Sequence, residues 1–435
     1  MSERLRNDLR QARRDSGMSW AHFSQATSFT PAYLRNVENG NRSLTIDVAA
    51  AYDRALRTDG KFEKELANAK TAPSAVPWGQ DGTALTVLAD LVDGRAGRVD
   101  RRGFVKAGAA MSASAGGWAG ALGIARPSAP VESAQSAGGT ALLVNMAGRL
   151  ELLRRLDDEL GSGEVRRQAS GELSLAVTLL KAGRYRGTAA NRLLRLAGEA
   201  ARQVAWYTFD QGRPDVAQRY FDASLRASAE AGDATGGIYT ISFAAVQLYS
   251  TGQADRAVAL LETARSQLRR HSTPRMEAML AARTARAMSK TTAKAATGRQ
   301  LRLAHDMLDR GPQDDEPEFL YWVTRSEVEM IAGSCALDLG DPAEALRRFE
   351  AGMRAHPSVD EEFPRSHAIY LARAAEAHLV LNDLDAAVAA AWQAAACLGS
   401  VDSARSSSQL KGLRVKLAPH AAYRPIADFL QAAAG

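Results

Sequence analysis

The chain has 435 residues, of which 46% are hydrophobic, 24% charged and 6% aromatic. This composition is typical of a globular protein with two or three domains, and it excludes collagen-like, coiled-coil and long disordered classes. Lys and Arg number 55 against 49 Asp and Glu, a net charge of +6. Because the only cysteines are Cys335 and Cys397, a disulfide framework is excluded and a reducing cytoplasm is the expected location.

Three regions of the sequence differ in character. Residues 1–70 contain short helical patterns, residues 71–140 are rich in Gly, Ala, Ser and Pro, and residues 141–435 form a nearly continuous amphipathic helical pattern interrupted at Gly or Asn. The sequence shows no run of alternating β-branched residues. We therefore expect an all-α protein in which a linker over 71–140 joins a small N-terminal domain to a long helical domain.

The N-terminal region predicts at least four short helices. Gly17 is expected to end the first, as a residue just beyond a helix C-terminus does. Ser19, Thr30 and Thr45 occupy positions typical of N-caps for three further helices, and Gly40 is expected to end the third. The second and third helices would then be separated by a turn of three residues, which is typical of a helix-turn-helix.

Three motifs carry a family resemblance: LRxxR at residues 9–13, FTPAYLRNVENG at 29–40 and NRSLT at 41–45. They resemble the Cro/repressor-type helix-turn-helix family, often called XRE. Trp20 and Ser24 depart from it, because the family often has Gln and Ala at these places. The resemblance implies double-stranded DNA as a partner and a recognition helix that enters the major groove.

Six residues match the positions through which that family meets DNA. Arg35 is the main candidate for recognising a base, since a guanidinium can bond bidentately to O6 and N7 of guanine. The alternative is that Arg35 is simply a solvated helix residue. By the family's docking geometry, Thr30 and Asn39 would contact phosphates, and Pro31, Ala32, Arg35 and Asn36 would face base edges.

The long helical region contains a repeat. Small residues recur seven residues before and five and twelve residues after Gly212, Gly252, Gly340 and Asn382. The offsets resemble those of the tetratricopeptide family, although the spacings of 40, 88 and 42 residues exceed that family's period of about 34. The 88-residue interval predicts two units, one of them degenerate and expected near Gly298. The resemblance implies an α-solenoid with a concave surface, and a generic Ala-rich bundle is the alternative.

In the tetratricopeptide family, the first helix of each hairpin lines the concave surface. A groove with aromatic and charged side chains favours a peptide or a small polar ligand over a lipid. The alternative is that the aromatic residues pack between hairpins. The matching positions are Arg202, Trp206, Asp210, Tyr239, Ser242, Tyr249, Glu327, Ser334 and Glu376.

Residues 100–106, DRRGFVK, resemble the twin-arginine export motif, and an Ala/Gly-rich stretch follows over 107–125. Export signals are N-terminal, whereas about 100 residues precede this motif. The first residues, Met1 to Arg14, are charged throughout and predict no signal peptide. The whole architecture resembles actinobacterial regulators that contain similar arginine pairs, so a linker or docking helix is favoured over a membrane anchor.

Motifs of catalysis are missing from the sequence, which has no HExxH, GxxxxGK[ST] or GxSxG pattern. The carboxylates at 314–316 and 361–362 are expected in solvated loops. We therefore expect no enzyme, no metal and no cofactor. The sequence favours a cytoplasmic, homodimeric transcriptional regulator whose repeats sense a peptide, a small molecule or a protein. A protein-interaction scaffold and a membrane-anchored sensor are the alternatives.

Overall fold

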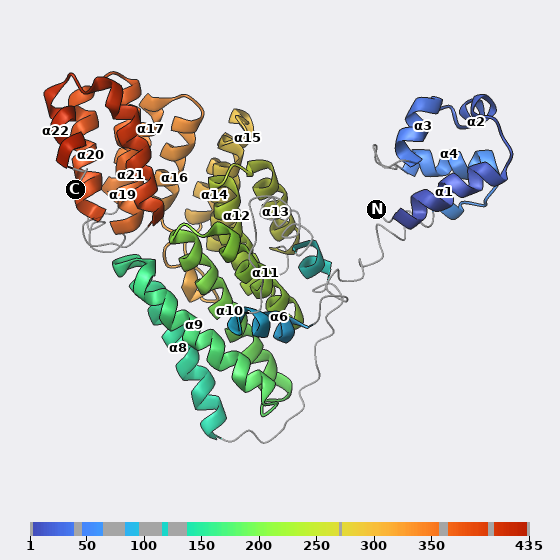
Figure 1. Cartoon of the computed structure of the whole chain (residues 1–435), viewed down its shortest axis with the longest axis horizontal. Coiled ribbons are helices and arrows are strands. Elements are labelled where there is room, and N and C mark those ends of the chain that lie inside the picture. Colours follow the sequence, from blue (N-terminus) through green and yellow to red (C-terminus); the bar gives the residue numbers. More distant parts are fainter. Residues whose placement is uncertain are drawn as a thin grey trace. The chain divides into compact units, whose positions relative to one another are not determined.

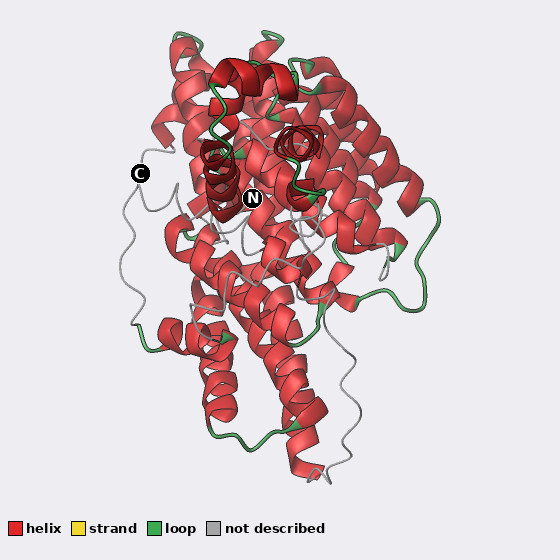
Figure 2. Cartoon of the chain, turned by 90° about the vertical axis from the view of Figure 1, so that its right-hand side faces the viewer, coloured by secondary structure: helices red, strands yellow, loops and turns green. Residues whose placement is uncertain are grey.

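The computed structural model describes residues 3–38, 46–63, 83–94, 115–120, 137–268, 272–355, 364–398 and 404–432. The chain divides into two compact units, Met1–Pro77 and Trp78–Gly435. Helices are the only regular elements of the described residues, which include no strand (Figure 2). The expectation of an all-α protein is confirmed.

The first unit contains the helices α1 (Glu3–Asp15), α2 (Trp20–Thr27), α3 (Pro31–Glu38) and α4 (Ile46–Leu56). The hydroxyl of Ser19 accepts a hydrogen bond from the backbone of His22, and that of Thr30 accepts one from the backbone of Tyr33. Both are N-cap bonds of the expected kind. Three residues, 28–30, separate α2 from α3. Thr45, Asn39 and Gly40 lie outside the described residues.

The first unit has a core of its own. The rings of Phe23 and Tyr52 meet edge to face, with their centroids 4.9 Å apart. All of the buried side chains come from residues 9–62, so this core is built from all four helices and the residues that follow α4. Its members are Leu9, Phe23, Leu34, Val37, Val48, Ala49, Tyr52 and Phe62.

The second unit is a succession of helical hairpins (Figure 1). Its first helices are α6 (Ala84–Val92), α8 (Ala137–Leu160), α9 (Ser162–Lys181), α10 (Gly187–Asp210), α11 (Pro214–Glu230), α12 (Ala234–Ser250), α13 (Ala254–Leu268), α14 (Pro274–Ser289) and α15 (Lys294–Leu308). They are followed by η2 (Glu318–Leu320), α16 (Arg325–Asp338), α17 (Pro342–Ala355), α19 (Pro364–Val380), α20 (Leu384–Leu398), α21 (Ala404–Leu417), η3 (Ala418–His420) and α22 (Arg424–Ala432). The closest pairs are α10 with α11, α12 with α13, α14 with α15, α16 with α17, and α19 with α20.

A residue with left-handed backbone conformation turns the chain in each of these five hairpins. Four are the expected Gly212, Gly252, Gly340 and Asn382, and the fifth is Thr292, at φ +60°. The degenerate unit was therefore expected at the wrong place, because Gly298 lies inside α15. Thr292 stands 40 residues after Gly252 and 48 before Gly340. The sequence did not predict the fifth turn, because a β-branched residue such as threonine rarely adopts a positive φ.

The small residues of the repeat lie where the two helices of a hairpin touch. A Cβ atom added to Gly333, seven residues before the turn at Gly340, would collide with the ring of Phe349 and lie 3.0 Å from the carbonyl oxygen of Ala345. In the unit that turns at Thr292, Ala285 and Ala304 occupy the matching positions and are fully buried. The pattern thus reflects close approach of helices rather than composition alone.

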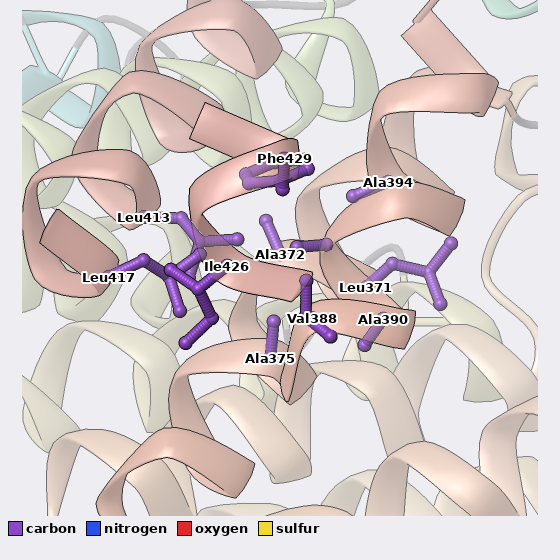
Figure 3. Close-up of a cluster of buried hydrophobic side chains, with 11 residues drawn as sticks. Leu371, Ala372, Ala375, Val388, Ala390, Ala394, Leu413, Leu417, Ile426 and Phe429 are labelled. Carbon is purple, nitrogen blue, oxygen red and sulfur yellow. The ribbon is translucent and has the colours of Figure 1, made fainter. Parts of the chain in front are cut away.

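The four last α-helices close the stack around an apolar cluster (Figure 3). Leu371 and Ala375 of α19 and Val388 of α20 meet Leu413 of α21 and Phe429 of α22. The ring of Trp392 packs edge-on against Phe429, 5.1 Å away. The last of these helices, α22, ends the described chain at Ala432.

The region expected as a linker, 71–140, contains helical residues with buried side chains. Thr83 caps α6, and the backbone N–H of Ala84 donates to the carboxylate of Glu230 in α11. Residues 115–120 are also helical, and Trp118 is fully buried there. The arginine-pair motif at 100–106 lies outside the described residues, as does the 107–125 stretch except for 115–120. No helix in the described ranges is long and apolar enough to cross a membrane.

Candidate functional site

A cavity of about 490 Å³ lies in the second unit along the first helices of successive hairpins. Its size falls in the range typical of small-molecule sites. It is rich in aromatic surface, contributed mainly by α10, α12 and the connection between α15 and α16. The aromatic lining residues are Trp206, Tyr207, Phe209, Tyr239, Phe243, Tyr249, Tyr321, Trp322 and Tyr370.

The connection from α15 to α16 contributes Tyr321 and Trp322 to this lining. The indole N–H of Trp322 donates to the hydroxyl of Tyr239 over 3.1 Å, and that hydroxyl donates to the carbonyl of Phe319, also over 3.1 Å. The rings of Tyr239 and Phe319 stack with their centroids 4.0 Å apart. The hydroxyl of Tyr321 donates to the carboxylate of Asp158 in α8. These bonds hold the connection against α8 and α12 and fix one wall of the cavity.

Arg202 also lines the cavity, and its guanidinium is paired with a carboxylate. Its Nε and Nη2 donate to the two carboxylate oxygens of Glu199 over 2.9 and 2.6 Å, and its guanidinium lies 4.5 Å from the ring centroid of Tyr239. Arg154 donates to the same carboxylate over 2.7 Å. Burial alone would raise the pKa of Glu199, but Arg202 and Arg154 lower it to about 2.

Asp338 gathers a second set of cations. It accepts hydrogen bonds from Arg286 and Arg373, the latter over 2.6 Å, and the amine of Lys290 lies 3.0 Å from it. Burial disfavours its charged form, but the three cations outweigh burial and hold the pKa of Asp338 well below its usual range. All three cations line the cavity, and Asp338 balances one of their three positive charges.

Arg283 of α14 is different. Its guanidinium lies 4.7 Å from the ring centroid of Trp322, and Tyr249 lies close enough to affect its pKa. Its Nε is buried without a hydrogen-bond partner, and no carboxylate of the described residues forms an ion pair with it. Burial alone would lower the pKa of Arg283, but Tyr249 and Glu327 raise it. Glu327 also accepts a hydrogen bond from Tyr370 over 2.9 Å.

Five of the nine groove residues expected from the sequence line this cavity: Arg202, Trp206, Tyr239, Tyr249 and Glu327. Trp206 also packs, since its indole N–H donates to Asp157 over 3.2 Å and its ring meets Phe243 edge-on at 4.7 Å. Trp206 therefore both lines the cavity and packs between hairpins.

The other four groove residues do not line the cavity. Asp210 accepts a hydrogen bond from the hydroxyl of Ser162, and the hydroxyl of Ser242 donates to the carbonyl of Tyr239. The carbonyl of Ser334 accepts from Arg373. Glu376 borders a separate hollow, where Lys416 lies 2.8 Å from it. Asp210, Ser334 and Glu376 thus contact neighbouring helices, whereas Ser242 bonds within α12.

Sequence reasoning missed Arg283 and Trp322, and each had a usable signal. Once the turn is placed at Thr292, Arg283 stands nine residues before it. Phe243, Ile331 and Arg373 stand nine residues before their own turns and also line the cavity. Trp322 lies between the turns at Thr292 and Gly340, which are 48 residues apart, whereas the other neighbouring turns are 40 to 42 residues apart. Glu316, expected in a solvated loop, instead pairs with Arg275 at 3.2 Å.

In the first unit, the residues expected to contact DNA begin at Thr30. Thr30, Ala32 and Arg35 are exposed, Pro31 and Asn36 are half-buried, and Asn39 lies outside the described residues. The guanidinium of Arg35 lies 5.0 Å from the ring centroid of Trp20 and forms no ion pair with a described residue. The side chain of Arg35 thus lies near an aromatic ring, and no carboxylate of the described residues neutralises its charge.

Glu38, at the end of α3, ties three helices together. Its buried carboxylate accepts hydrogen bonds from Arg13 of α1 over 2.7 and 3.0 Å and from the hydroxyl of Tyr52 in α4 over 2.9 Å. Arg10 donates to its backbone carbonyl over 2.7 Å. A glutamate at this position therefore fixes where α3 ends relative to α1 and α4.

In comparisons with known proteins, no family model, no curated protein and no solved structure shows a significant match to this chain.

Proposed function

We propose that this protein is a transcriptional regulator that binds double-stranded DNA through its first unit and senses a ligand through the cavity of its second unit. The observation that carries the DNA-binding part is the pair α2 and α3, which a three-residue turn joins, with Arg35 exposed on α3. The resemblance of residues 9–45 to Cro/repressor-type helix-turn-helix proteins supports the same role. We also propose that the protein acts as a homodimer, since one helix-turn-helix grips few phosphates and two half-sites bind more tightly.

The sensing part of the proposal is supported by the cavity. The cavity is lined by nine aromatic side chains and by six cationic ones, Arg154, Arg202, Arg283, Arg286, Lys290 and Arg373. Apolar surface with a few placed charged groups is the usual make-up of a small-molecule site.

Selection of DNA from a random pool by the full-length protein tests the DNA-binding role. We expect a preferred site with two half-sites about one helical turn apart or a multiple of it. Affinity should fall steeply with salt, because phosphate contacts release counterions. Absence of any selected sequence would favour the scaffold alternative.

Arg35→Ala should weaken binding to the selected site by about 1–3 kcal/mol and relax the preference at one base position, if Arg35 recognises a base edge. Arg54→Ala is the matched control: Arg54 is exposed on α4 of the same unit and should leave the preference unchanged. Equal binding by the Arg35 variant and the parent, in fluorescence anisotropy at several salt concentrations, would remove Arg35 from the interface.

A further inference from the structure

Five of the six cations that line the cavity fall into two groups, each of which shares one carboxylate. Arg154 and Arg202 share the carboxylate of Glu199, and Arg286, Lys290 and Arg373 share that of Asp338. Within the described chain, Arg283 has no carboxylate at ion-pairing distance. Burial removes water that would otherwise solvate this guanidinium, and Tyr249, Glu327 and Tyr370 favour its charged form instead of an ion-paired carboxylate.

Aromatic groups surround the guanidinium of Arg283. Its carbon lies 4.7 Å from the ring centroid of Trp322, and Tyr249 and Tyr370 stand close enough to affect its pKa. All three rings line the cavity. An anion that reaches Arg283 would therefore lie beside flat apolar surface, and the rest of the same ligand could pack on these rings.

The acidic lining residues limit the charge of such a ligand. Glu327, Asp157 and Asp158 all line the cavity, so a dianion such as a phosphate monoester would meet repulsion from these carboxylates. A monoanion pairs with Arg283 and leaves the remaining charge pattern in balance. A carboxylate matches the planar fork of a guanidinium and can accept two parallel hydrogen bonds from it.

We propose that the cavity binds a small molecule made of a planar aromatic group and a single carboxylate, and that Arg283 holds the carboxylate. This inference deepens the sensing role and rests on it. The cavity of about 490 Å³ accommodates two or three fused or linked rings better than a folded peptide segment. Trp322 and Tyr249 would lie against the ring system.

The test uses the full-length protein and three aromatic acids, 2-naphthoate, 4-biphenylcarboxylate and 9-anthracenecarboxylate, each beside its neutral carboxamide. Titration calorimetry should show saturable one-to-one binding of at least one acid. The acid should bind about ten- to a hundredfold more tightly than its own amide, since a hydrogen-bonded charge pair distinguishes the two. Quenching of tryptophan fluorescence should accompany binding, because Trp206 and Trp322 line the site.

Arg283→Gln should reduce affinity for the acid to that for the amide while leaving the affinity for the amide unchanged. The matched control is Arg302→Gln, on the exposed face of α15, which should keep the full preference. Thermal melts of both variants establish that each is folded. A truncation of the flat surface, Trp322→Leu, should weaken the binding of both acid and amide, because both ligands carry the ring system that would lie against Trp322.

Three outcomes would overturn the proposal: none of the acids binds, the acid preference survives in the Arg283→Gln variant, or a random hexapeptide pool binds the cavity while the acids do not. The proposed DNA-binding function is tested independently, by selecting DNA with the same protein in the absence of any acid. If acids bind and no DNA is selected, the ligand class stands and the regulator does not.

Discussion

At the scale of single residues, neighbours decide what a charged side chain can do. Arg202 and Arg283 both line the same cavity. Arg202 donates to Glu199 at 2.6 and 2.9 Å, whereas Arg283 lies beside the ring of Trp322 and close to Tyr249. Pairing a ligand carboxylate to Arg202 would first require breaking a buried ion pair, which typically costs several kcal/mol. Residue type alone therefore does not identify the anion-binding group, and its existing partners do.

Trp118 and Gly237 form another contact that depends on one residue. A Cβ atom added to Gly237 would overlap the indole of Trp118, whose ring is fully buried. Gly237 belongs to α12, and the same helix presents Tyr239 and Phe243 to the cavity. The segment 115–120 is thus packed against the backbone of a helix that lines the candidate binding site.

Gly237→Ala should expel Trp118 from its place and destabilise the second unit by about 3–5 kcal/mol, the usual cost of losing a buried tryptophan. The emission of Trp118 should shift to longer wavelength, as its ring becomes exposed to water. Urea unfolding followed by tryptophan fluorescence measures both effects. Trp118→Phe isolates the contribution of this one indole to the spectrum.

The matched control for this prediction is Gly171→Ala in α9, where a Cβ atom would meet nothing within 4 Å. It should stabilise the chain by about 0.5–1 kcal/mol, as alanine does in a helix interior. If Gly237→Ala behaved like Gly171→Ala, the close contact with Trp118 would be disproved.

At the scale of elements, the hairpin turns show how far sequence reasoning reaches. Gly17, Ser19 and Thr30 were predicted as helix ends, and Gly212, Gly252, Gly340 and Asn382 as turns, because each acts through bonds to residues a few positions away. The turn at Thr292 was missed because threonine carries no such signal. Tyr321 and Trp322 were missed because their roles depend on Asp158 and Tyr239, which lie far away in sequence.

The same local logic explains why all-α architecture was predictable and the cavity was not. Periodic apolar residues define the buried face of a helix wherever it packs. The partner of Arg202 stands three residues away on the same helix, but the surroundings of Arg283 come from three other helices, α12, α16 and α19, and from the connection that carries Trp322. About half of the groove residues were identified. The repeat offsets predict which face of a helix lies toward the groove, but they do not reveal which side chains on that face are covered by neighbouring helices.

Thr292→Gly should stabilise the hairpin of α14 and α15. Thr292 is exposed and holds φ at +60°, where a β-branched residue is strained by about 1–2 kcal/mol. Glycine relieves the strain but is more flexible in the unfolded chain, so a net gain of about 1 kcal/mol is expected. The backbone bond from Ala293 to Met288 is kept.

The urea midpoint of the Thr292→Gly variant, measured beside that of Asn382→Gly, checks this prediction. Asn382 occupies the equivalent turn at φ +59°, and asparagine tolerates this conformation better than threonine. The gain at 382 should therefore be clearly smaller. A loss of stability at 292 would mean that the threonine side chain contributes a contact that outweighs its strain.

At the scale of the whole molecule, the two units have separate cores and distinct proposed tasks. Each is compact by its own contacts, Met1–Pro77 around Phe23 and Tyr52 and Trp78–Gly435 around successive hairpins. The second unit carries the two carboxylates, Glu199 and Asp338, whose pKa values are lowered most clearly by buried cations. Charge pairing beside the cavity thus contributes to the stability of that unit as a whole.

Acid should therefore destabilise the second unit through these two carboxylates. The pKa of Glu199 falls from 4.5 in an unperturbed chain to about 2 when folded, because Arg202 and Arg154 outweigh its burial. A lowered folded-state pKa gives stability that is fully present above the unfolded value and is lost as the pH falls toward the folded value. For Glu199 this contribution is about 3 kcal/mol, lost progressively between about pH 5 and pH 2, and Asp338 acts in the same direction.

Urea midpoints of the full-length protein, measured from pH 7 to pH 3 by circular dichroism, should fall with this slope. Glu199→Gln should be less stable than the parent at pH 7, since it leaves Arg202 without a carboxylate, yet its stability should change less between pH 5 and pH 3. Glu164→Gln, at an exposed pair on α9, provides the control and should follow the parent at every pH. Parallel pH profiles for Glu199→Gln and the parent would show that the pairing of Glu199 with Arg202 does not govern acid stability, and the loss would then have to come from other carboxylates such as Asp338.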